Sequence, residues 1–210
     1  MGIAVMTATG APQRAVGPAQ PVASAQPLLQ LQGVHTHIGA YHILHGVDLA
    51  VPQGELTMLL GRNGAGKTTT LRTIMGLWQA SQGRITFAGR DITRLHTPHI
   101  AHLNIAYVPE NMGIFADLTV KENMLLAARQ ARNVAQMDTA RLEWIFKLFP
   151  AVEKFWNHPA GKLSGGQKQM LAVSRAIVEP RDLLIIDEPS KGLAPVMVNN
   201  MIDAFGQLKK

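Results

Sequence analysis

Gly61-Arg-Asn-Gly-Ala-Gly-Lys-Thr68 is the stretch that decides the fold of this 210-residue chain. It follows an apolar segment at residues 55–60 and leads into residues 67–77, where apolar side chains recur at helical spacing. A strand, a glycine-rich turn and a helix in this order match the phosphate-binding pattern G-x-x-x-x-G-K-[ST]. Glycines let successive N–H groups turn toward an anion, and the helix adds the positive end of its dipole. The sequence therefore predicts a phosphate-binding loop.

The residue types in this loop indicate how a nucleoside triphosphate binds. A lysine at position 67 can reach the β- and γ-phosphates, and the hydroxyl group of Thr68 can bind the accompanying Mg²⁺ ion. We therefore expect Lys67 to act in catalysis and Thr68 to be a metal ligand. The other loop residues expected to bind the nucleotide are Gly61, Asn63, Gly64, Ala65, Gly66 and Thr69.

A second motif, Leu183-Leu-Ile-Ile-Asp-Glu188, places two carboxylates after four apolar residues. Such a run is typical of a strand that is buried on both faces, and ligands gather at the carboxyl ends of parallel strands. We expect Asp187 to hold Mg²⁺ through its water shell, and Glu188 to position or deprotonate the attacking water. The alternative is a pair of acidic residues that merely ends a strand. Together with the phosphate loop, the motif predicts hydrolysis of a nucleoside triphosphate.

A third motif, Leu163-Ser-Gly-Gly-Gln167, lies about 100 residues beyond Lys67. A Ser-Gly-Gly turn that opens a helix is a second anion-binding helix N-terminus on the same chain. One phosphate group cannot easily contact both N-termini. The second one could therefore serve a nucleotide that is bound to a partner chain.

These three motifs, in this order, resemble the ATP-binding cassette (ABC) family, and the resemblance covers about residues 28–208. In that family two cassettes pack head to tail, so that each nucleotide lies between the phosphate loop of one cassette and the signature turn of the other. The resemblance implies that ATP and Mg²⁺ are the cofactors. It also implies that Ser164, Gly165, Gly166 and Gln167 contact ATP bound to a second ATPase subunit.

Finer similarities point to one branch of that family. The chain is similar to the shorter ATP-binding protein of branched-chain amino acid transporters in three stretches, Gly64-Ala-Gly-Lys-Thr-Thr-Thr-Leu-Arg72, Tyr107-Val-Pro-Glu110 and Asp187-Glu-Pro-Ser-Lys-Gly-Leu-Ala-Pro195. Glu110 stands where most cassettes have a glutamine that joins Mg²⁺ to the permease contact, and a glutamate is typical of this branch. The resemblance therefore makes Glu110 a contact of both nucleotide and metal.

The resemblance also implies a function at a membrane. The chain would be an ATPase subunit on the cytoplasmic face of the inner membrane, energising an importer of branched-chain amino acids or related amino acids and amides. Its partners would be a second cassette and membrane permease subunits, and it would bind neither the cargo nor nucleic acid. Two alternatives stay open: a cassette outside transport that acts on nucleic acid or ribosomes, and a truncated cassette that binds nucleotide or a partner cassette without turnover.

Some positions depart from the family pattern. Most cassettes stack adenine on an aromatic residue directly before a glycine of the first hairpin, whereas Ile38 precedes Gly39 here. Either His37 or Tyr41 could take that role. Cassettes also continue beyond the last predicted helix, residues 195–208, into a further strand and a switch loop. We therefore expect a cassette that lacks its C-terminal part.

Composition narrows the class of protein. The chain has 20 Lys and Arg residues against 14 Asp and Glu residues, a formal net charge of +6, and no cysteine. Disulfides, thiolate metal sites and cysteine nucleophiles are therefore excluded. The basic residues are scattered rather than grouped, which argues against a nucleic-acid partner. No apolar run reaches the roughly 20 residues that span a bilayer.

The order of predicted elements indicates an α/β fold. Residues 28–34 and 44–51 are expected to form antiparallel strands, and strands alternate with helices after them. Residues 1–27 are rich in Ala, Pro and Gln and carry one charge, so we expect a disordered tail. Residues 28–210 are predicted to form one P-loop NTPase-type ABC ATPase domain. It would have a parallel core sheet, an N-terminal antiparallel β flank and a helical signature subdomain at about 117–165.

Periodicity and turn residues locate the remaining elements. Further strands are expected over residues 55–60, 84–87, 105–108 and 183–186. Helices are expected over residues 67–77, 120–129, 138–149, 168–178 and 195–208. Two groups of histidines, His35 with His37 and His96 with His99 and His102, have spacings that can bind metal, but no carboxylate or thiolate accompanies them, so we expect no metal there.

Overall fold

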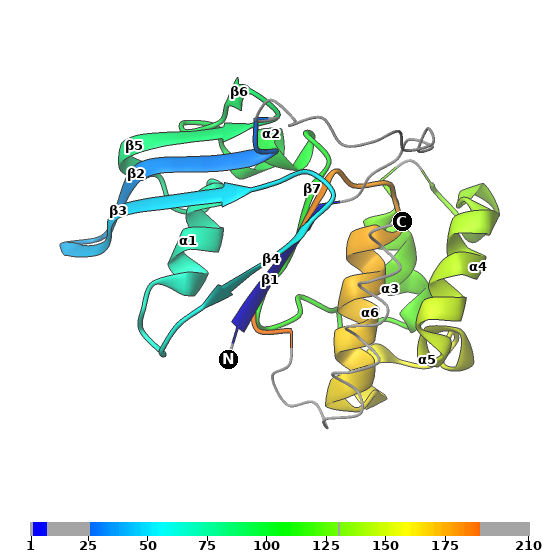
Figure 1. Ribbon diagram of the computed structural model, residues 1–210. Helices are drawn as coiled ribbons and strands as arrows, with labels where there is room; N and C mark the ends of the chain where they lie inside the picture. The colour runs from blue at the N-terminus through cyan, green and yellow to red at the C-terminus, as the bar shows by residue number, and fades with distance from the viewer. Residues whose placement is uncertain (1, 8–25, 130, 190–210) are drawn as a thin grey trace, which may run out of the picture.

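Two β-sheets and a group of helices make up the fold (Figure 1). The computed structural model describes residues 2–7, 26–129 and 131–189. An antiparallel sheet lies on one side, a second sheet passes through the middle, and the later helices gather on the other side. The α/β class predicted from the sequence is confirmed.

The antiparallel sheet forms the predicted N-terminal flank, with the strand order β3-β2-β5-β6. Its strands are β2 (Leu29–Ile38), β3 (Tyr41–Val51), β5 (Ala80–Phe87) and β6 (Arg90–Asp91). A shift in register between Thr36 and His37 leaves Ile43 as an extra residue of β3. This bulge lies at the end of the hairpin that is next to the phosphate loop.

The middle sheet has the strand order β4-β1-β8-β7. Its strands are β1 (Gly2–Thr7), β4 (Leu56–Leu60), β7 (Ile105–Val108) and β8 (Leu183–Ile186). Strands β7 and β8 are parallel, and β1 is antiparallel to both β4 and β8, so β4 and β8 run in one direction. The predicted parallel core thus consists of β4, β7 and β8. Their carboxyl ends lie at one edge of the sheet and lead into the phosphate loop, Glu110 and the acidic pair.

Strand β1 corrects the prediction for the N-terminus. The expectation of a disordered tail over residues 1–27 is wrong for residues 2–7, which pair with β4 on one side and β8 on the other. Pairing on both sides provides partners for the backbone groups of an inserted strand. The segment Gly-Ile-Ala-Val-Met-Thr has no alternation of apolar and polar residues, and its short apolar run, residues 3–6, does not by itself distinguish a buried strand from other buried structure. Residues 8–25 lie outside the described residues.

Six α-helices belong to the described part of the chain. They are α1 (Lys67–Ile74), α2 (Thr97–Ala101), α3 (Val120–Ala127), α4 (Thr139–Leu148), α5 (Pro150–Lys154) and α6 (Gly165–Ile177). Two 3₁₀ turns, Val134–Gln136 and Ala160–Lys162, connect helices of this group. The short helices α2 and α5 were not predicted, because five residues are too few to show a helical period. The predicted helix at 195–208 lies outside the described residues.

Side-chain caps set where two of these helices begin. Thr119 caps α3 together with Glu122, and Ser164 caps α6 together with Gln167, each in a reciprocal capping box. Because Ser164 is the cap, α6 begins at Gly165 and not after Gln167 as the sequence suggested.

Two hydrophobic clusters hold the layers together. One lies between the antiparallel sheet, α1 and the middle sheet and includes Leu71 and Ile185. The other joins the middle sheet to α3–α6 and includes Leu171 and Ile186. Ile185 and Ile186 are adjacent in β8 and face opposite clusters, as alternate residues of a strand must. Strand β8 therefore fixes the helical group relative to the phosphate loop.

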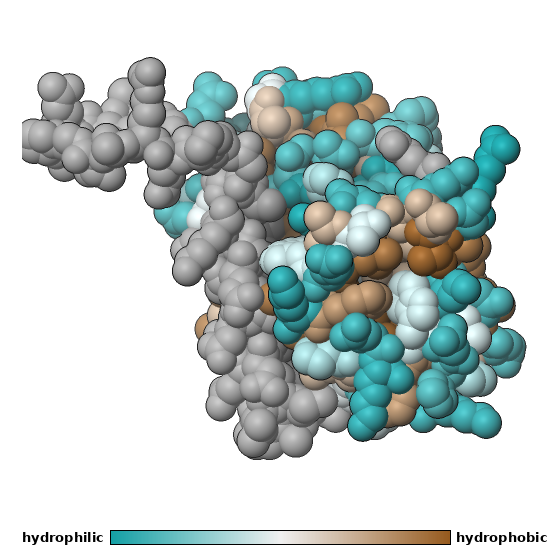
Figure 2. Space-filling model, turned by 90° about the vertical axis from the view of Figure 1, so that its right-hand side faces the viewer, coloured by the Kyte–Doolittle hydropathy of each residue, from teal (hydrophilic) through white to brown (hydrophobic). Residues whose placement is uncertain are grey.

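The helical side of the molecule mixes hydrophobic and hydrophilic residues on its surface (Figure 2). Within the described residues, no helix is both long enough and apolar enough to cross a membrane.

Candidate functional site

The phosphate loop joins β4 to α1 and requires glycine at two positions. Gly64 has φ 82° and Gly66 has φ 84°, in the left-handed region that other residues rarely adopt. A Cβ atom added at Gly66 would also lie 2.9 Å from Cδ2 of Leu44 on β3. The backbone conformation therefore disfavours a side chain at this position, and a side chain there would also require Leu44 to shift.

The N-terminus of α1 has the properties of an anion site. Gly66 is its N-cap, and it provides no side chain to accept hydrogen bonds from the first N–H groups of the helix. The N–H groups at the start of the helix are therefore left for another acceptor. Nζ of Lys67 donates to the carbonyl oxygens of Gly61 at 3.0 Å and Arg62 at 3.1 Å, so the lysine lies over the loop. Phosphate oxygens could replace these two carbonyl groups as acceptors.

The carboxylate of Asp187 lies directly after β8 and is only 1% exposed. Thr68 donates a hydrogen bond from Oγ1 to Oδ1 at 3.1 Å, and Tyr107 donates from its hydroxyl group to Oδ2 at 3.3 Å. Burial raises the pKa of Asp187, and the nearby charges of Glu110 and Glu188 add to that rise, while the two hydrogen bonds oppose it.

These groups fit a divalent cation that is shared with a bound phosphate. Three carboxylates, Asp187, Glu110 and Glu188, lie near one another beside the hydroxyl group of Thr68. Oε2 of Glu188 is buried and has no hydrogen-bond partner among the described residues. A cation would relieve this local excess of negative charge. Among the described residues, no group of three or more His, Asp or Glu side chains is arranged to hold a metal ion by itself.

A cavity of about 470 Å³ lies between these groups and the hairpin of β2 and β3. It is lined by Ile43, Asn63, Gly64, Gly66, Lys67, Thr68, Thr69, Glu110 and Glu188. Eight of these nine residues were predicted from the sequence to act at the nucleotide site. The exception is Ile43, which reaches the cavity because of the bulge in β3, a feature that no local sequence pattern indicates.

Glu188, which the sequence predicts to act on the attacking water, has an unusual backbone conformation at the cavity. It lines the cavity opposite the phosphate loop and has a positive φ of 50°, which is uncommon outside glycine. Such strain is found at sites where the surrounding structure holds a residue in place. The arrangement can bind a phosphate chain, hold a cation beside it and present a carboxylate to a water molecule.

The signature turn lies apart from this cavity. Ser164, Gly165 and Gly166 are not among its lining residues. Oγ of Ser164 accepts a hydrogen bond from the backbone N–H of Gln167, and Oε1 of Gln167 accepts one from the backbone N–H of Ser164. The structure therefore does not bring the signature turn to the nucleotide cavity of the same chain, in keeping with a role toward a partner chain.

Neither residue expected to stack on adenine lines the cavity. Tyr41 is 76% exposed at the tip of the hairpin. His37 hydrogen-bonds to Oγ of Ser81 at 3.0 Å and stacks on His42, with the ring centroids 4.1 Å apart. The ring of His42 also lies 3.9 Å from that of His45. The assignment of the adenine contact therefore stays a prediction.

One contact at the site was not predicted from the sequence: Tyr107 on β7 donates a hydrogen bond to Asp187 at the end of β8. The segment Tyr107-Val-Pro-Glu110 was noted only as a stretch shared with a family. The contact follows from a general rule, because alternate residues of neighbouring parallel strands lie on the same face of a sheet. The strand order needed to apply that rule is not visible in the sequence.

Comparison with known proteins agrees with this geometry. The family model for the ABC transporter matches residues 44–191, which include the phosphate loop, the signature turn and the acidic pair. The chain belongs to the ABC transporter family. As a member of this family, it is an ATP-binding subunit with ATPase activity.

Several relatives of this ABC chain are named for amino-acid transport. The High-affinity branched-chain amino acid transport ATP-binding protein BraG of Pseudomonas aeruginosa is 37% identical over 87% of this chain and 78% of its own length. The Probable branched-chain amino acid transport ATP-binding protein LivF of Archaeoglobus fulgidus is 36% identical over 80% of this chain and 70% of its own length. Other relatives are named for glutamate transport, sulfate/thiosulfate import and Nod factor export.

The fold of this ABC chain is also found in solved structures. An ATP-binding cassette of an ABC transporter in its ADP conformation has a TM-score of 0.72 and 24% sequence identity. The match covers 88% of this chain and 78% of that chain. The predicted cassette fold, with its β flank and helical group around a phosphate loop, is therefore confirmed.

Proposed function

We propose that this chain binds Mg·ATP and hydrolyses it to energise a membrane importer of branched-chain amino acids or related amino acids and amides. The observation that carries the proposal is the cavity that Lys67, Thr68, Glu110 and Glu188 line together. In this proposal residues 28–210 act as one ABC ATPase domain, with a helical signature subdomain at about 117–165.

Each residue at the cavity has one role in this mechanism. Lys67 moves from the loop carbonyls to the β- and γ-phosphates and neutralises charge there. Thr68 and Asp187 would hold Mg²⁺, Asp187 through its water shell, and Glu110 would be a further contact of the cation. Glu188 accepts the proton of the attacking water at Oε2 or Oε1. When bound, the cation stabilises negative charge on the phosphate oxygens.

A second cassette would complete the site. Ser164, Gly165, Gly166 and Gln167 would contact ATP on the partner chain, because the turn is exposed and distant from its own chain's cavity. ATP would thus lie between two chains packed head to tail. Binding would favour the closed pair, and hydrolysis would let the two chains separate.

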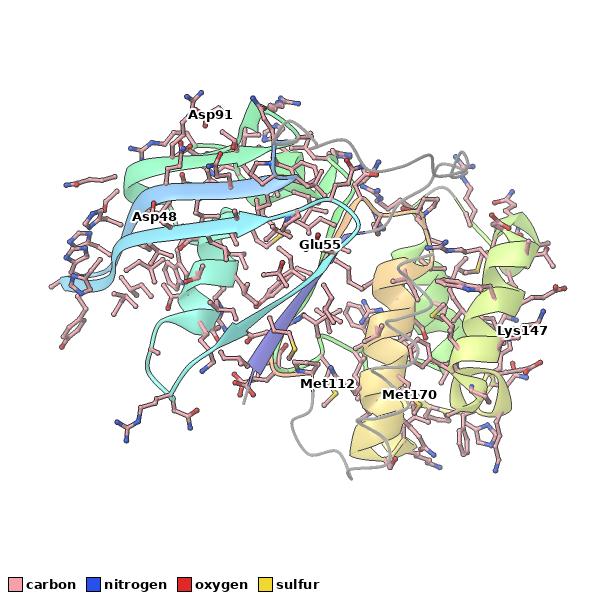
Figure 3. The ribbon with its side chains drawn as sticks, viewed as in Figure 1. Asp48, Glu55, Asp91, Met112, Lys147 and Met170 are labelled. Atoms are coloured by element: carbon pink, nitrogen blue, oxygen red, sulfur yellow. The ribbon has the colours of Figure 1, made fainter. Side chains whose placement is uncertain are left out.

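A groove of about 720 Å³ supports docking to a membrane permease. It runs between α1, β7 and α6, and its lining includes the side chains of Arg72, Trp78, Tyr107, Met112 and Arg175. Met112 lies between the middle sheet and the helical group (Figure 3). Two arginines in a mostly apolar groove favour a permease segment with an acidic side chain.

The groove and the nucleotide cavity share one segment of chain. Pro109, Asn111, Met112 and Gly113 line the groove, while Glu110 lines the cavity. A permease segment in the groove would therefore contact the neighbours of a residue that faces the γ-phosphate. This short connection offers a physical route from hydrolysis to movement of the permease. It would place the subunit at the cytoplasmic face of the membrane.

The cargo assignment rests on similarity to the proteins named for branched-chain amino acid transport. It is tested by uptake of labelled leucine, glutamate, urea and sulfate in cells of the source organism that carry either the wild-type gene or Glu188→Gln. We expect loss of leucine uptake in the variant and unchanged sulfate uptake. Unchanged leucine uptake with loss of another substrate would overturn the cargo assignment and leave the ATPase assignment standing.

A further inference from the structure

One hydrogen bond at the site has no role in the mechanism described above. The hydroxyl group of Tyr107 donates to Oδ2 of Asp187 at 3.3 Å, while Thr68 donates to Oδ1 at 3.1 Å. Asp187 is almost fully buried. Each of the two oxygens of this carboxylate is therefore held by a different protein hydroxyl group.

The pairing of β7 with β8 brings Tyr107 close to Asp187. In the parallel pair of β7 and β8, Tyr107 lies opposite Ile185, and Asp187 follows Ile185 on the same face. The backbone N–H of Asp187 also donates to the carbonyl oxygen of Val108 at 2.9 Å, which continues the pairing beyond the end of β8. The backbone thus fixes the distance between the tyrosine and the carboxylate.

Arg72 sets the direction of the hydrogen bond. The side chain of Arg72 also forms a hydrogen bond with the hydroxyl group of Tyr107. A guanidinium group can only donate, so the oxygen of Tyr107 accepts from Arg72, and its single hydrogen is directed to Asp187.

We propose that Tyr107 is a positioning residue for the Mg·ATP site, which holds the carboxylate of Asp187 so that its other oxygen faces Thr68. The inference rests on the proposed function of that site. Partners that orient metal-binding groups from behind commonly change metal affinity by about 10- to 100-fold when they are removed. Tyr107 and Arg72 both line the groove, so a permease segment that contacts Arg72 would act two hydrogen bonds away from Asp187.

The test is Tyr107→Phe, which removes one oxygen atom and keeps the ring that packs against the core. The affinity of Mn²⁺ for the chain saturated with a non-hydrolysable ATP analogue is measured by electron paramagnetic resonance. We expect it to fall about tenfold. The affinity for the same analogue in EDTA is expected to change less than twofold, because the phosphate loop is intact.

Thr93→Val supplies a matched control. Thr93 donates to Oδ1 of Asp91 at 2.6 Å, so this variant also removes a hydroxyl–carboxylate hydrogen bond, but on the antiparallel sheet. It should leave the Mn²⁺ affinity unchanged. Unchanged Mn²⁺ affinity in Tyr107→Phe, or an equal loss of affinity in EDTA, would overturn the proposal.

Arg72 provides a second test of the same geometry. Arg72→Lys keeps a cationic donor toward Tyr107, whereas Arg72→Gln offers an oxygen that can accept the tyrosine proton. We expect two- to threefold weaker Mn²⁺ binding in Arg72→Gln and near wild-type binding in Arg72→Lys. The reverse order would contradict the proposed direction of the hydrogen bond. A wild-type chain that bound no nucleotide would instead refute the proposed function, before either variant was compared.

Discussion

The N-termini of α1 and α6 both follow a glycine-containing turn, but they are built in opposite ways. Gly66 precedes α1 and leaves its first turn without a side-chain cap, whereas Ser164 and Gln167 close the start of α6 with a reciprocal capping box. The first N-terminus lies in a cavity with Lys67 and the acidic residues. The second is exposed and has no ionisable group in its capping box.

The difference matches the two roles in the proposed function, in which the N-terminus of α1 binds the chain's own nucleotide and that of α6 binds the nucleotide of a partner chain. An uncapped N-terminus is incomplete until phosphate binds, so its helix must be held in place by packing, as α1 is by both sheets. A capped N-terminus has its first N–H groups satisfied without a ligand, and in the proposed function it contacts the nucleotide of another chain. The predictions below test these two properties, beginning with the largest expected effect.

Glu188→Gln removes the carboxylate that we propose as the general base and leaves the N-termini of α1 and α6 unchanged. We expect turnover to fall about 10²- to 10⁴-fold, because the amide cannot accept the proton of the attacking water. Nucleotide affinity should change less than twofold, since glutamine has the same size. Phosphate release and equilibrium binding measure the two quantities. Turnover above a tenth of the wild-type rate would exclude Glu188 as the general base.

Lys67→Ala removes the lysine side chain at the uncapped N-terminus of α1. A ligand that binds only the folded chain at a hundredfold excess over its Kd stabilises that chain by about 2.7 kcal/mol. We expect Mg·ATP to produce a thermal shift of this size in the wild type and little shift in Lys67→Ala. Lys162→Ala, an exposed lysine close to the signature turn, serves as the control and should behave like the wild type. Equal shifts in all three proteins would contradict the role of Lys67.

Ser164→Ala tests the capped N-terminus. Loss of the cap should lower the free energy of unfolding by about 1 kcal/mol. We also expect turnover to fall severalfold while the isolated chain keeps its nucleotide affinity, because in the proposed function Ser164 contacts the nucleotide of the partner chain.

Thr119→Ala is the matched control for that experiment. It removes the same kind of capping box from α3 and should lower stability by a similar amount without changing turnover beyond that effect. Chemical denaturation and phosphate release distinguish the two variants. A Ser164→Ala chain that loses its own nucleotide affinity would show that the signature turn acts within one chain.

The pH dependence of stability should distinguish the N-terminus of α1, which lies beside Asp187, from that of α6. The variant that tests this is Asp187→Asn. Burial raises the pKa of Asp187 above its usual value, so the folded chain binds this proton more tightly than the unfolded chain does. Stability without metal should therefore decrease as pH rises from the usual pKa of an aspartate through the raised value. Asparagine carries no charge, so the variant should melt about 2 °C higher than the wild type at neutral pH.

Thermal melts between pH 4 and pH 8 in EDTA measure this effect. Ser164→Ala should keep the wild-type pH dependence, since neither member of its capping box titrates in this range. A lower melting temperature for Asp187→Asn than for the wild type at neutral pH would show that the two hydrogen bonds to the carboxylate outweigh its desolvation.

Much of the site could be predicted because its residues lie in short contiguous motifs. The phosphate loop, with Lys67 and Thr68, is specified by glycines whose backbone conformation is local. Asp187 and Glu188 follow an apolar run that marks a buried strand. In each case the chemistry depends on neighbours within a few residues, and such neighbours are visible in the sequence.

The contributions that escaped prediction depend on strand order and register. Strand β1 has no polar–apolar alternation and is defined only by its two partners, β4 and β8. Ile43 reaches the cavity through a bulge, and Tyr107 reaches Asp187 across two neighbouring strands. A residue's own neighbours in the chain carry no information about such pairings.

By itself, the sequence determined the α/β class, the phosphate loop and the acidic pair, because local conformation and residue chemistry suffice for each. Only the tertiary structure decided that Glu110 and Glu188 share one cavity with Lys67, and that the signature turn lies outside it. The physical reason is that a parallel sheet gathers the carboxyl ends of strands that are distant in the chain. Which ends become neighbours is settled by the packing of the sheet between two hydrophobic clusters.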